Sequence, residues 1–278
     1  MNSLKHIFKM KRFGLIGNPI AHSKSPALFK AAYSGEDSYE LIEAENLEAS
    51  MNKFLNSDFM GINVTSPYKD VVMQYVTCPD RISSLLGSAN VLLKGDVDAD
   101  GRVQILSYNT DYYGVKNTIS DILHKNGSLL KSEGNKGVLS VMVVGAGGAG
   151  KAAALAMCDM GFKVFLANRS AGKVAEYAGM IGAEYIPLDA VAEVIKGVDI
   201  VIYSLSFLID GLKGADLCDK IVFEANYANP VLAPECGVVS CMYIDGKWWL
   251  YNQAIPAFEL FTGRAPNVLN MRRVIGLE

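Results

Sequence analysis

The 278-residue sequence is poor in the residues that hold metal ions and form disulfides. Its three histidines, His6, His22 and His124, are far apart and show no His-x-x-His spacing. Its five cysteines form no Cys-x-x-Cys pair. An odd number of widely spaced cysteines argues against a disulfide framework and against a zinc site. We therefore predict reduced thiols and no catalytic metal.

The sequence also lacks a long hydrophobic run and an excess of charge of one sign. Its most apolar stretch, from Val138 onward, is interrupted by glycines and by Lys151, well short of the ~20 residues that a membrane helix needs. The 26 basic and 29 acidic residues are interleaved, and the first residues are too polar for a secretory signal. These absences predict a cytoplasmic protein without nucleic-acid or membrane partners. The sequence leaves open whether it is a monomer or a homodimer.

What the sequence has in quantity is apolar residues, at 50% of the chain, which is enough for one large core or two modest ones. Over the first ~110 residues, short apolar runs alternate with helix-like stretches, as is typical of an α/β unit. The turn residues near 95–101 predict a hairpin. A helix is expected from Asp111 to about His124, and the polar segment 127–137 indicates a boundary.

Behind this boundary, residues 138–170 contain an apolar strand, a glycine-rich turn, an alanine-rich helix and a second apolar strand, which together predict a βαβ unit. The turn fits G-x-G-x-x-G, whose glycines let the backbone approach a pyrophosphate at a helix N-terminus. The alternative is a turn that only packs helix against strand. We predict a dinucleotide site, whose turn residues are Gly145, Ala146, Gly147, Gly148 and Ala149.

The end of the second strand indicates which dinucleotide is bound. NAD sites carry an acidic residue there to accept hydrogen bonds from the ribose hydroxyls, whereas this strand ends with Asn168, Arg169 and Ser170. Arg169 can pair with the 2′-phosphate of NADP, and Lys173 is close enough in sequence to add a second cation. The pattern favours NADP over NAD.

Two N-terminal clusters, residues 17–26 and 61–69, are dense in small polar residues beside predicted turns. Taken alone, Ser25-Pro26 and Ser66-Pro67 are each explained as a helix N-cap followed by proline. This explanation accounts for the prolines and for one serine in each cluster. It leaves the other polar residues of the clusters unexplained.

The unexplained residues are Asn63, Thr65 and Lys69. Asn63 and Thr65 are two residues apart at the predicted end of a strand, so their side chains point the same way, and Lys69 is expected one helical turn beyond. Such a cluster suits a hydroxylated, anionic ligand. His22, in the other cluster, is interpreted as structural rather than as an acid or base.

These two clusters occur together with NTDYYG (109–114), GAGGAG (145–150), NRS (168–170) and G-x-x-x-L-x-x-Q-A (246–254) in a fixed order. In this respect the sequence resembles the shikimate dehydrogenase family over about residues 12–262. The resemblance implies an N-terminal α/β substrate domain, a Rossmann-type doubly wound NADP-binding domain, and a C-terminal helix that returns to the substrate domain. It places the substrate-binding and catalytic domain at residues 1–110 and 246–278, and the NADP-binding domain at 111–245.

The resemblance also implies roles for individual residues. Ser23 and Ser25 would hold the substrate carboxylate, Tyr227 would reach the same region, and Gly246 would lie beside the nicotinamide. The residues implied to contact the ring hydroxyls are Asn63, Thr65, Asn90, Asp111 and Gln253. Lys69 and Asp111 would form the catalytic pair.

Several of these residues have structural alternatives. Asn90 is also explained as a strand cap, and Asp111 as the N-cap of its helix. Tyr227 and Gln253 are also explained as domain-interface residues.

The activity implied by the resemblance is the reversible, NADP-dependent reduction of 3-dehydroshikimate to shikimate, a step of chorismate and aromatic amino-acid biosynthesis. The cofactor carries the hydride, and a protonated lysine, Lys69, would supply the proton that the developing alkoxide needs. An adjacent carboxylate at Asp111 would hold and orient that lysine.

The sequence departs from the family at a few positions. Tyr203, Ser204 and Leu205 stand where relatives usually carry Asn-Ala-Thr, and Phe29-Lys30 stands where they carry His-Asn. Two alternatives therefore remain, a quinate/shikimate dehydrogenase with a shifted substrate and a non-catalytic nucleotide- or metabolite-binding protein of the same fold. Retention of both Lys69 and Asp111 favours an enzyme.

Overall fold

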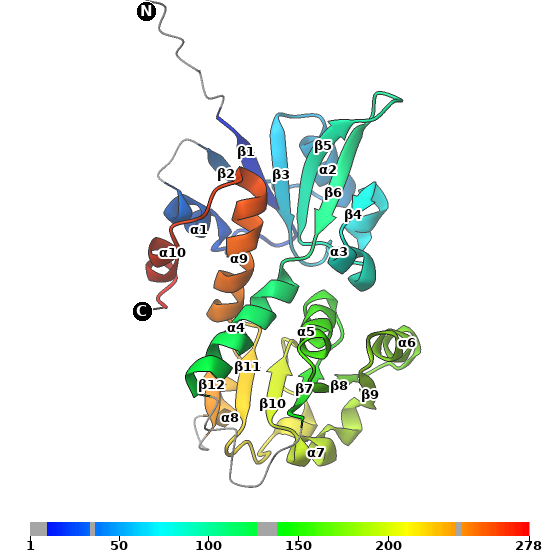
Figure 1. Cartoon of the computed structure of the whole chain (residues 1–278), viewed down its shortest axis with the longest axis vertical. Coiled ribbons are helices and arrows are strands. Elements are labelled where there is room, and N and C mark those ends of the chain that lie inside the picture. The colour runs from blue at the N-terminus through cyan, green and yellow to red at the C-terminus, as the bar shows by residue number, and fades with distance from the viewer. Residues whose placement is uncertain (1–9, 34–36, 127–137, 237–240, 278) are drawn as a thin grey trace, which may run out of the picture. The chain divides into compact units, whose positions relative to one another are not determined.

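The computed structural model describes residues 10–33, 37–126, 138–236 and 241–277. Contacts divide the chain into two compact units, one made of residues 1–109 and 254–278 and the other of residues 110–253 (Figure 1). The predicted boundary segment 127–137 and nearly all of the leader before Lys11 lie outside the described residues. Within the described residues, no helix is long and apolar enough to span a bilayer.

The first unit is built on a six-stranded mixed sheet in the order β2-β1-β3-β5-β6-β4. Its strands are β1 (Arg12–Ile16), β2 (Ser38–Leu41), β3 (Phe59–Val64), β4 (Cys78–Pro79), β5 (Val91–Val97) and β6 (Val103–Tyr108). β1 pairs in parallel with both β2 and β3, whereas β5 runs antiparallel to β3 and β6. Parallel pairing brings the carboxyl ends of β1 and β3 to one edge of the sheet.

The predicted hairpin is confirmed as β5–β6. Its turn is closed by Asp98, whose Oδ1 accepts hydrogen bonds from the backbone N–H groups of Asp100 and Arg102, both at 2.9 Å. Gly101 occupies the turn with φ of 79°, a conformation that glycine adopts without steric cost. Local turn chemistry therefore determines this element.

Among its described residues, the first unit also contains four α-helices and one 3₁₀ helix, besides the end of α9. They are α1 (Ser25–Ala32), α2 (Leu47–Leu55), η1 (Val71–Tyr75), α3 (Arg81–Leu86) and α10 (Val268–Val274). Asn46 caps α2 by accepting from the N–H of Ala49, and Asp80 caps α3 by accepting from that of Ser83. The core under α2 includes Met51 and Ile62, both fully buried.

The helix α9 (Lys247–Thr262) crosses from one unit to the other, since Gln253 belongs to the second and Ala254 to the first. Its last turns join an aromatic cluster of the first unit. The ring centroid of Phe261 lies 4.8 Å from that of Phe13, and the centroid of Phe258 lies 5.1 Å from that of Phe29. The predicted return of the C-terminal helix to the N-terminal domain is confirmed.

The second unit holds a six-stranded sheet in the order β12-β11-β10-β7-β8-β9, with every pairing parallel (Figure 1). Its strands are β7 (Ser140–Val144), β8 (Lys163–Asn168), β9 (Glu184–Pro187), β10 (Ile200–Tyr203), β11 (Ile221–Glu224) and β12 (Met242–Ile244). Strand order reverses between β7 and β10, as in a doubly wound Rossmann sheet, where ligands bind at the switch point. The predicted fold class is confirmed.

The helices of the second unit are α4 (Asp111–Asn126), α5 (Gly148–Asp159), α6 (Gly172–Ile181), α7 (Val191–Val194) and α8 (Ala233–Cys236), with 3₁₀ turns η2 (Leu188–Ala190), η3 (Ile195–Gly197) and η4 (Asp210–Leu212). The predicted βαβ unit is β7–α5–β8. All five residues of β7 are buried, as a central parallel strand covered on both faces requires. The helix expected from Asp111 is α4, and the Tyr112 hydroxyl fastens it to α5 by donating to Asp159 at 2.8 Å.

The aromatic cluster predicts that α9 contributes to the stability of the first unit. Phe261 is 5% exposed, and Phe261→Ala should lower the free energy of unfolding by about 3–5 kcal/mol, the usual cost of truncating a buried phenylalanine. Leu269→Ala is the control, because Leu269 is 62% exposed and its truncation should cost less than about 0.5 kcal/mol. Urea unfolding of both variants checks this. Equal free energies of unfolding for the two variants would contradict the contribution of Phe261 packing to the stability of the first unit.

Candidate functional site

In the first unit, the two predicted polar clusters lie at the carboxyl ends of adjacent parallel strands, β1 and β3. They are in contact, because a Cβ on Gly17 would lie 2.3 Å from Cγ2 of Thr65. The backbone N–H of Asn18 also donates to the carbonyl of Ser66 at 3.1 Å. The structure thus joins two clusters that are about 40 residues apart in the sequence, as parallel pairing requires.

The two serines of the first cluster lie at the start of α1. Lys24 occupies the N-cap position, Ser25 is the first helical residue, and no side chain caps the helix from Lys24. The N-cap explanation of Ser25 is therefore wrong. Instead, Ser23 Oγ accepts from the N–H of Ser25 at 3.2 Å, and both serines remain half-buried.

The second cluster is a turn rather than a helix start. The N–H of Tyr68 donates to the carbonyl of Thr65 at 2.9 Å, and no α-helix follows Ser66-Pro67. Lys69 precedes the 3₁₀ helix η1, so its expected place one helical turn beyond Thr65 is wrong. The reason is that the Lys69 carbonyl accepts from the N–H of Ala89 at 2.9 Å, a contact made outside any helix.

Asn63 and Asn90 meet at the base of this cluster, where they are 8% and 3% exposed. Asn63 Nδ2 donates to the Asn90 carbonyl at 3.0 Å, and Asn63 Oδ1 accepts from the hydroxyl of Tyr39 at 2.8 Å. Buried polar groups need such partners, because an unsatisfied one costs about 1–3 kcal/mol. The result is a polar cluster with a fixed orientation of the Asn63 amide.

Sequence reasoning missed Tyr39 and Asn109. Tyr39 lies on β2, 24 residues before Asn63, and nothing in its local pattern distinguishes it from a packing tyrosine. Asn109, 1% exposed, donates from Nδ2 to both the carbonyl and Oγ of Ser88 at 3.0 Å. The signal for Asn109 was its place at the start of the NTDYYG motif.

In the second unit, the glycine-rich turn follows β7 at the switch point of the sheet. Gly145 has φ of 97°, and a Cβ on Gly150 would lie 1.9 Å from the Gly145 carbonyl oxygen. These two glycines are therefore required by packing alone. Gly147, the N-cap residue of α5, is different: a Cβ there meets nothing within 4 Å, which leaves the helix N-terminus open to a ligand.

The last residue of β8 and the residues that follow it form the other side of the candidate dinucleotide site. Asn168 Oδ1 accepts from the N–H of Ala146 at 3.4 Å, and Asn168 Nδ2 donates to the Ser170 carbonyl at 3.1 Å. Asn168 thus links the glycine turn to the loop that follows. The side chains of Arg169, Ser170 and Lys173 are exposed.

The segment that departs from the family pattern has its own hydrogen bonds. Tyr203 is fully buried; its hydroxyl donates to the carbonyl of Phe207 at 2.5 Å and accepts from the N–H of Ile209 at 3.2 Å. Burial raises the pKa of Tyr203 to about 12, so the phenol stays protonated at neutral pH. Ser204 Oγ donates to the Val144 carbonyl at 3.0 Å and ties the segment to the end of β7.

Asp111 and Gln253 come from α4 and α9 of the second unit. The carbonyl of Thr110 accepts from the N–H of Gly114, so Thr110 holds the N-cap position and the N-cap explanation of Asp111 is wrong. Thr110 Oγ1 donates to Gln253 Oε1 at 3.1 Å. The two helices approach closely, because a Cβ on Gly114 would lie 3.0 Å from Gln253 Cβ.

Tyr227 lies half-buried in the loop after β11, which a buried carboxylate anchors. Glu224 is fully buried, and its carboxylate accepts from the N–H groups of Val231 and Leu232 and from the Tyr243 hydroxyl. This carboxylate fixes both ends of the loop.

Gly246 packs against the beginning of the same loop, where a Cβ would lie 2.5 Å from the Ala225 carbonyl oxygen. It is followed at once by α9, whose first N–H, that of Lys247, donates to Asp245 Oδ1 at 2.8 Å. Only a residue without a side chain fits between these two elements.

Comparison with known families gives two matches. The family model described as "Shikimate dehydrogenase substrate binding domain" matches residues 15–92, and the model described as "Shikimate / quinate 5-dehydrogenase" matches residues 130–207. A protein of Archaeoglobus fulgidus named shikimate dehydrogenase (NADP(+)) is 33% identical to this chain, over 95% of this chain and 97% of its own length. This chain belongs to the shikimate dehydrogenase family.

Solved structures of the shikimate dehydrogenase family agree with the fold. Quinate dehydrogenase from Corynebacterium glutamicum, in complex with NAD, superposes with a TM-score of 0.79 at 25% identity, over 96% of this chain and 98% of that one. A shikimate dehydrogenase in complex with NADP⁺ superposes with a TM-score of 0.78 at 26% identity, over 96% and 95%. The same fold thus carries either cofactor.

In this shikimate dehydrogenase family member, the residues of the predicted catalytic pair belong to different units. Lys69 is half-buried in the first unit, and Asp111, 6% exposed, begins α4 in the second. Their pairing stays a prediction. In the described ranges, no three His, Cys, Asp or Glu side chains gather as metal ligands.

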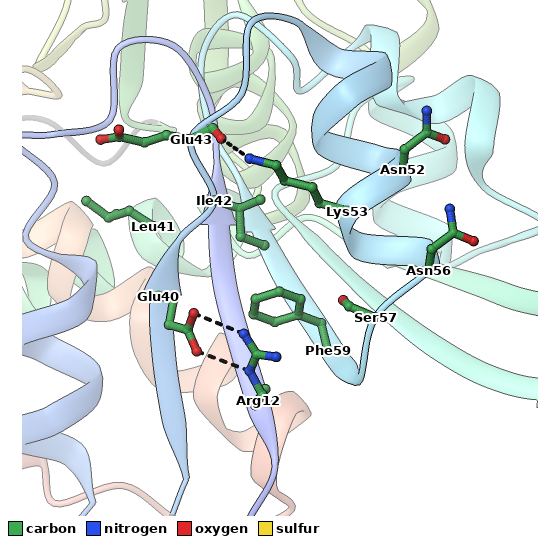
Figure 2. Close-up of a pocket in the computed structure, with 10 residues that line it drawn as sticks. All are labelled: Arg12, Glu40, Leu41, Ile42, Glu43, Asn52, Lys53, Asn56, Ser57 and Phe59. Carbon is green, nitrogen blue, oxygen red and sulfur yellow. Dashed lines mark hydrogen bonds and ion pairs between the residues drawn. The ribbon is translucent and has the colours of Figure 1, made fainter.

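The first unit also has a surface hollow of about 640 Å³ that contains none of the predicted residues (Figure 2). Three of its charged side chains, those of Arg12, Glu40 and Lys53, already have partners. Arg12 donates to both carboxylate oxygens of Glu40 at 3.1 Å, and Lys53 Nζ donates to the Glu43 carbonyl at 2.6 Å. Nothing in this hollow resembles the polar cluster at the ends of β1 and β3.

The geometry of the glycine turn predicts that two similar substitutions affect different properties, one the stability of the fold and the other the binding of the cofactor. Gly150→Ala forces a methyl group against the Gly145 carbonyl and should lower the free energy of unfolding by at least about 2–3 kcal/mol. Gly147→Ala meets no protein atom and should leave stability within about 0.5 kcal/mol of wild type while weakening binding of NADP⁺. Thermal unfolding with and without NADP⁺ measures both effects. Equal destabilisation by the two variants would contradict the assignment of Gly150 to packing and of Gly147 to cofactor binding.

Proposed function

We propose that this chain is an NADP-dependent shikimate dehydrogenase that reversibly reduces 3-dehydroshikimate to shikimate. The observation that carries the proposal is nearly full-length similarity to an NADP⁺-dependent shikimate dehydrogenase, at 33% identity. The polar cluster in the first unit and the open glycine turn in the second support it. A chain that had lost the activity would have no need to retain Lys69 and Asp111.

The residues of the second unit fit NADP. The N-terminus of α5, which no N-cap side chain covers, offers backbone N–H groups and a partial positive charge to the pyrophosphate. The exposed cations Arg169 and Lys173 follow β8, where a 2′-phosphate attached to the adenosine ribose would need them. The bound cofactor supplies the hydride. Gly145 to Ala149, Asn168, Ser170 and Gly246 are the other proposed contacts.

The residues of the first unit fit a hydroxylated ring acid. The half-buried hydroxyls of Ser23 and Ser25 are proposed to hold the carboxylate, with Tyr227 reaching the same region. The proposed partners of the ring hydroxyls are Asn63, Thr65, Asn90, Asp111 and Gln253. A site built of buried amides and hydroxyls rejects ligands that lack the matching hydroxyl, because its own groups then stay unpaired.

Lys69 and Asp111 are proposed to manage the proton. During reduction, the Lys69 ammonium donates a proton to the developing alkoxide; during oxidation, the amine accepts the proton of the substrate hydroxyl. Asp111 is buried at the first position of α4, where the helix dipole favours its negative charge, and it orients the lysine. The proposed mechanism requires no metal ion.

A quinate-type substrate is the second candidate function. The similarity to a quinate dehydrogenase, with a TM-score of 0.79, favours testing it. Turnover is therefore measured with shikimate and with quinate, each with NADP⁺ and with NAD⁺. Absence of turnover in all four combinations would leave a binding protein of the same fold.

Removal of the proton donor tests the mechanism. Lys69→Ala should lower kcat by about 10²–10⁴-fold, because general acid–base catalysis contributes roughly that factor. Lys53→Ala is the matched control, an exposed lysine of the same unit that lines only the surface hollow, and it should keep wild-type activity. The absorbance of the reduced nicotinamide gives the rates. Retained activity in Lys69→Ala would contradict the role of Lys69.

Removal of the cation after β8 tests cofactor choice. Arg169→Ala should raise KM for NADP⁺ by about 10–100-fold, as expected for loss of a charge-assisted hydrogen bond to phosphate, and leave KM for NAD⁺ nearly unchanged. Lys196→Ala is the control, an exposed lysine of the same unit paired with Glu193. Steady-state kinetics with both cofactors measures the ratio. An equal change for NADP⁺ and NAD⁺ would contradict recognition of the 2′-phosphate.

A further inference from the structure

The hydroxyl of Tyr39 contacts Asn63, a residue of the proposed substrate site. It donates to Asn63 Oδ1 at 2.8 Å. β1 separates β2 from β3, so the phenol of Tyr39 reaches across a strand to contact Asn63.

The ring of Tyr39 is held by the aromatic cluster of the first unit. Its centroid lies 5.0 Å from that of Phe29, 6.3 Å from that of Phe258 and 6.4 Å from that of Phe261. Burial raises the pKa of the phenol, so the hydroxyl remains protonated and able to donate at every physiological pH. A rigid ring with a protonated hydroxyl provides a fixed donor.

This donor determines how the Asn63 amide is presented. The carbonyl of Asn90 only accepts hydrogen bonds, so the amide nitrogen of Asn63 must face Asn90 and its oxygen must face Tyr39. One N–H and one lone pair of the amide then remain for a ligand. A hydroxyl group, which both donates and accepts, satisfies both.

We propose that Tyr39 is a positioning residue for substrate recognition: it fixes the orientation of the Asn63 amide, so that this amide presents one N–H and one oxygen lone pair to a ring hydroxyl of the substrate. The proposal rests on the proposed function of this site. Tyr39 contacts no reacting atom, and its effect is transmitted through Asn63.

The test is Tyr39→Phe, which removes only the hydroxyl and keeps the ring in the aromatic cluster. KM for shikimate should rise about three- to tenfold, as expected for one hydrogen bond, while KM for NADP⁺ and the melting temperature stay near wild type. The preference for shikimate over an analogue that lacks one ring hydroxyl should fall by a similar factor. A purely structural role would leave that preference unchanged.

Tyr33→Phe is the matched control. Tyr33 belongs to the same aromatic cluster, with its centroid 5.4 Å from that of Phe29, but its hydroxyl contacts the Arg264 carbonyl and Thr262. It should not change KM for shikimate. A rise equal to that of Tyr39→Phe would overturn the proposal, because the effect would then come from the cluster.

A double-mutant cycle with Asn63→Ala separates positioning from an independent contribution. If Tyr39 acts through Asn63, Tyr39→Phe should add little to the KM of Asn63→Ala; additive effects would overturn the proposal. Calorimetric titration of wild-type protein with shikimate distinguishes the two levels of inference. If the wild-type protein binds and turns over shikimate and Tyr39→Phe does so equally well, only the role of Tyr39 is overturned. Wild type that neither binds nor turns over shikimate overturns the proposed function, and this inference with it.

Discussion

Parallel pairing of neighbouring strands is the constraint on which the site depends. Parallel strands end at the same edge of a sheet, so the loops that follow them meet there although they are far apart in the sequence. In the first unit, β1 and β3 bring residues 17–26 to residues 65–69. In the second, β7 and β10 bring the glycine turn to Ser204. Functional residues in the loops after these strands are therefore brought together by the strand pairing itself.

Buried polar groups then give each edge a fixed geometry. Among the described residues, no buried side-chain nitrogen or oxygen lacks a hydrogen-bond partner. Asn63 is held by two neighbours, Asn109 by Ser88, and the Glu224 carboxylate by three donors. Because leaving any one of these groups unpaired is costly, each network admits few alternative arrangements. Rigidity of this kind suits a site that distinguishes ligands by single hydroxyl groups.

The glycine turn shows how packing and binding share one motif. Gly145 and Gly150 are fixed by contact between the end of β7 and the start of α5, whereas Gly147 has no protein neighbour at its missing side chain. The motif therefore fits both explanations that the sequence allowed, a turn that packs a helix against a strand and a turn that leaves room for a dinucleotide. Tyr203 likewise combines two roles. Its hydroxyl hydrogen-bonds the segment up to Ile209, and its ring packs in the core of the second unit.

The sequence by itself determined the α/β class, the βαβ unit at the glycine turn, the hairpin at 91–108 and the family. Each of these rests on local periodicity, on turn residues or on motifs whose order is visible along the chain. Only the tertiary structure decided that Ser25 and Asp111 follow their caps rather than act as caps, and that Lys69 lies in a turn. It alone revealed Tyr39, because the hydrogen bond from Tyr39 to Asn63 spans 24 residues and crosses a strand. Contacts of this kind depend on which strands become neighbours, and local sequence patterns do not encode that choice.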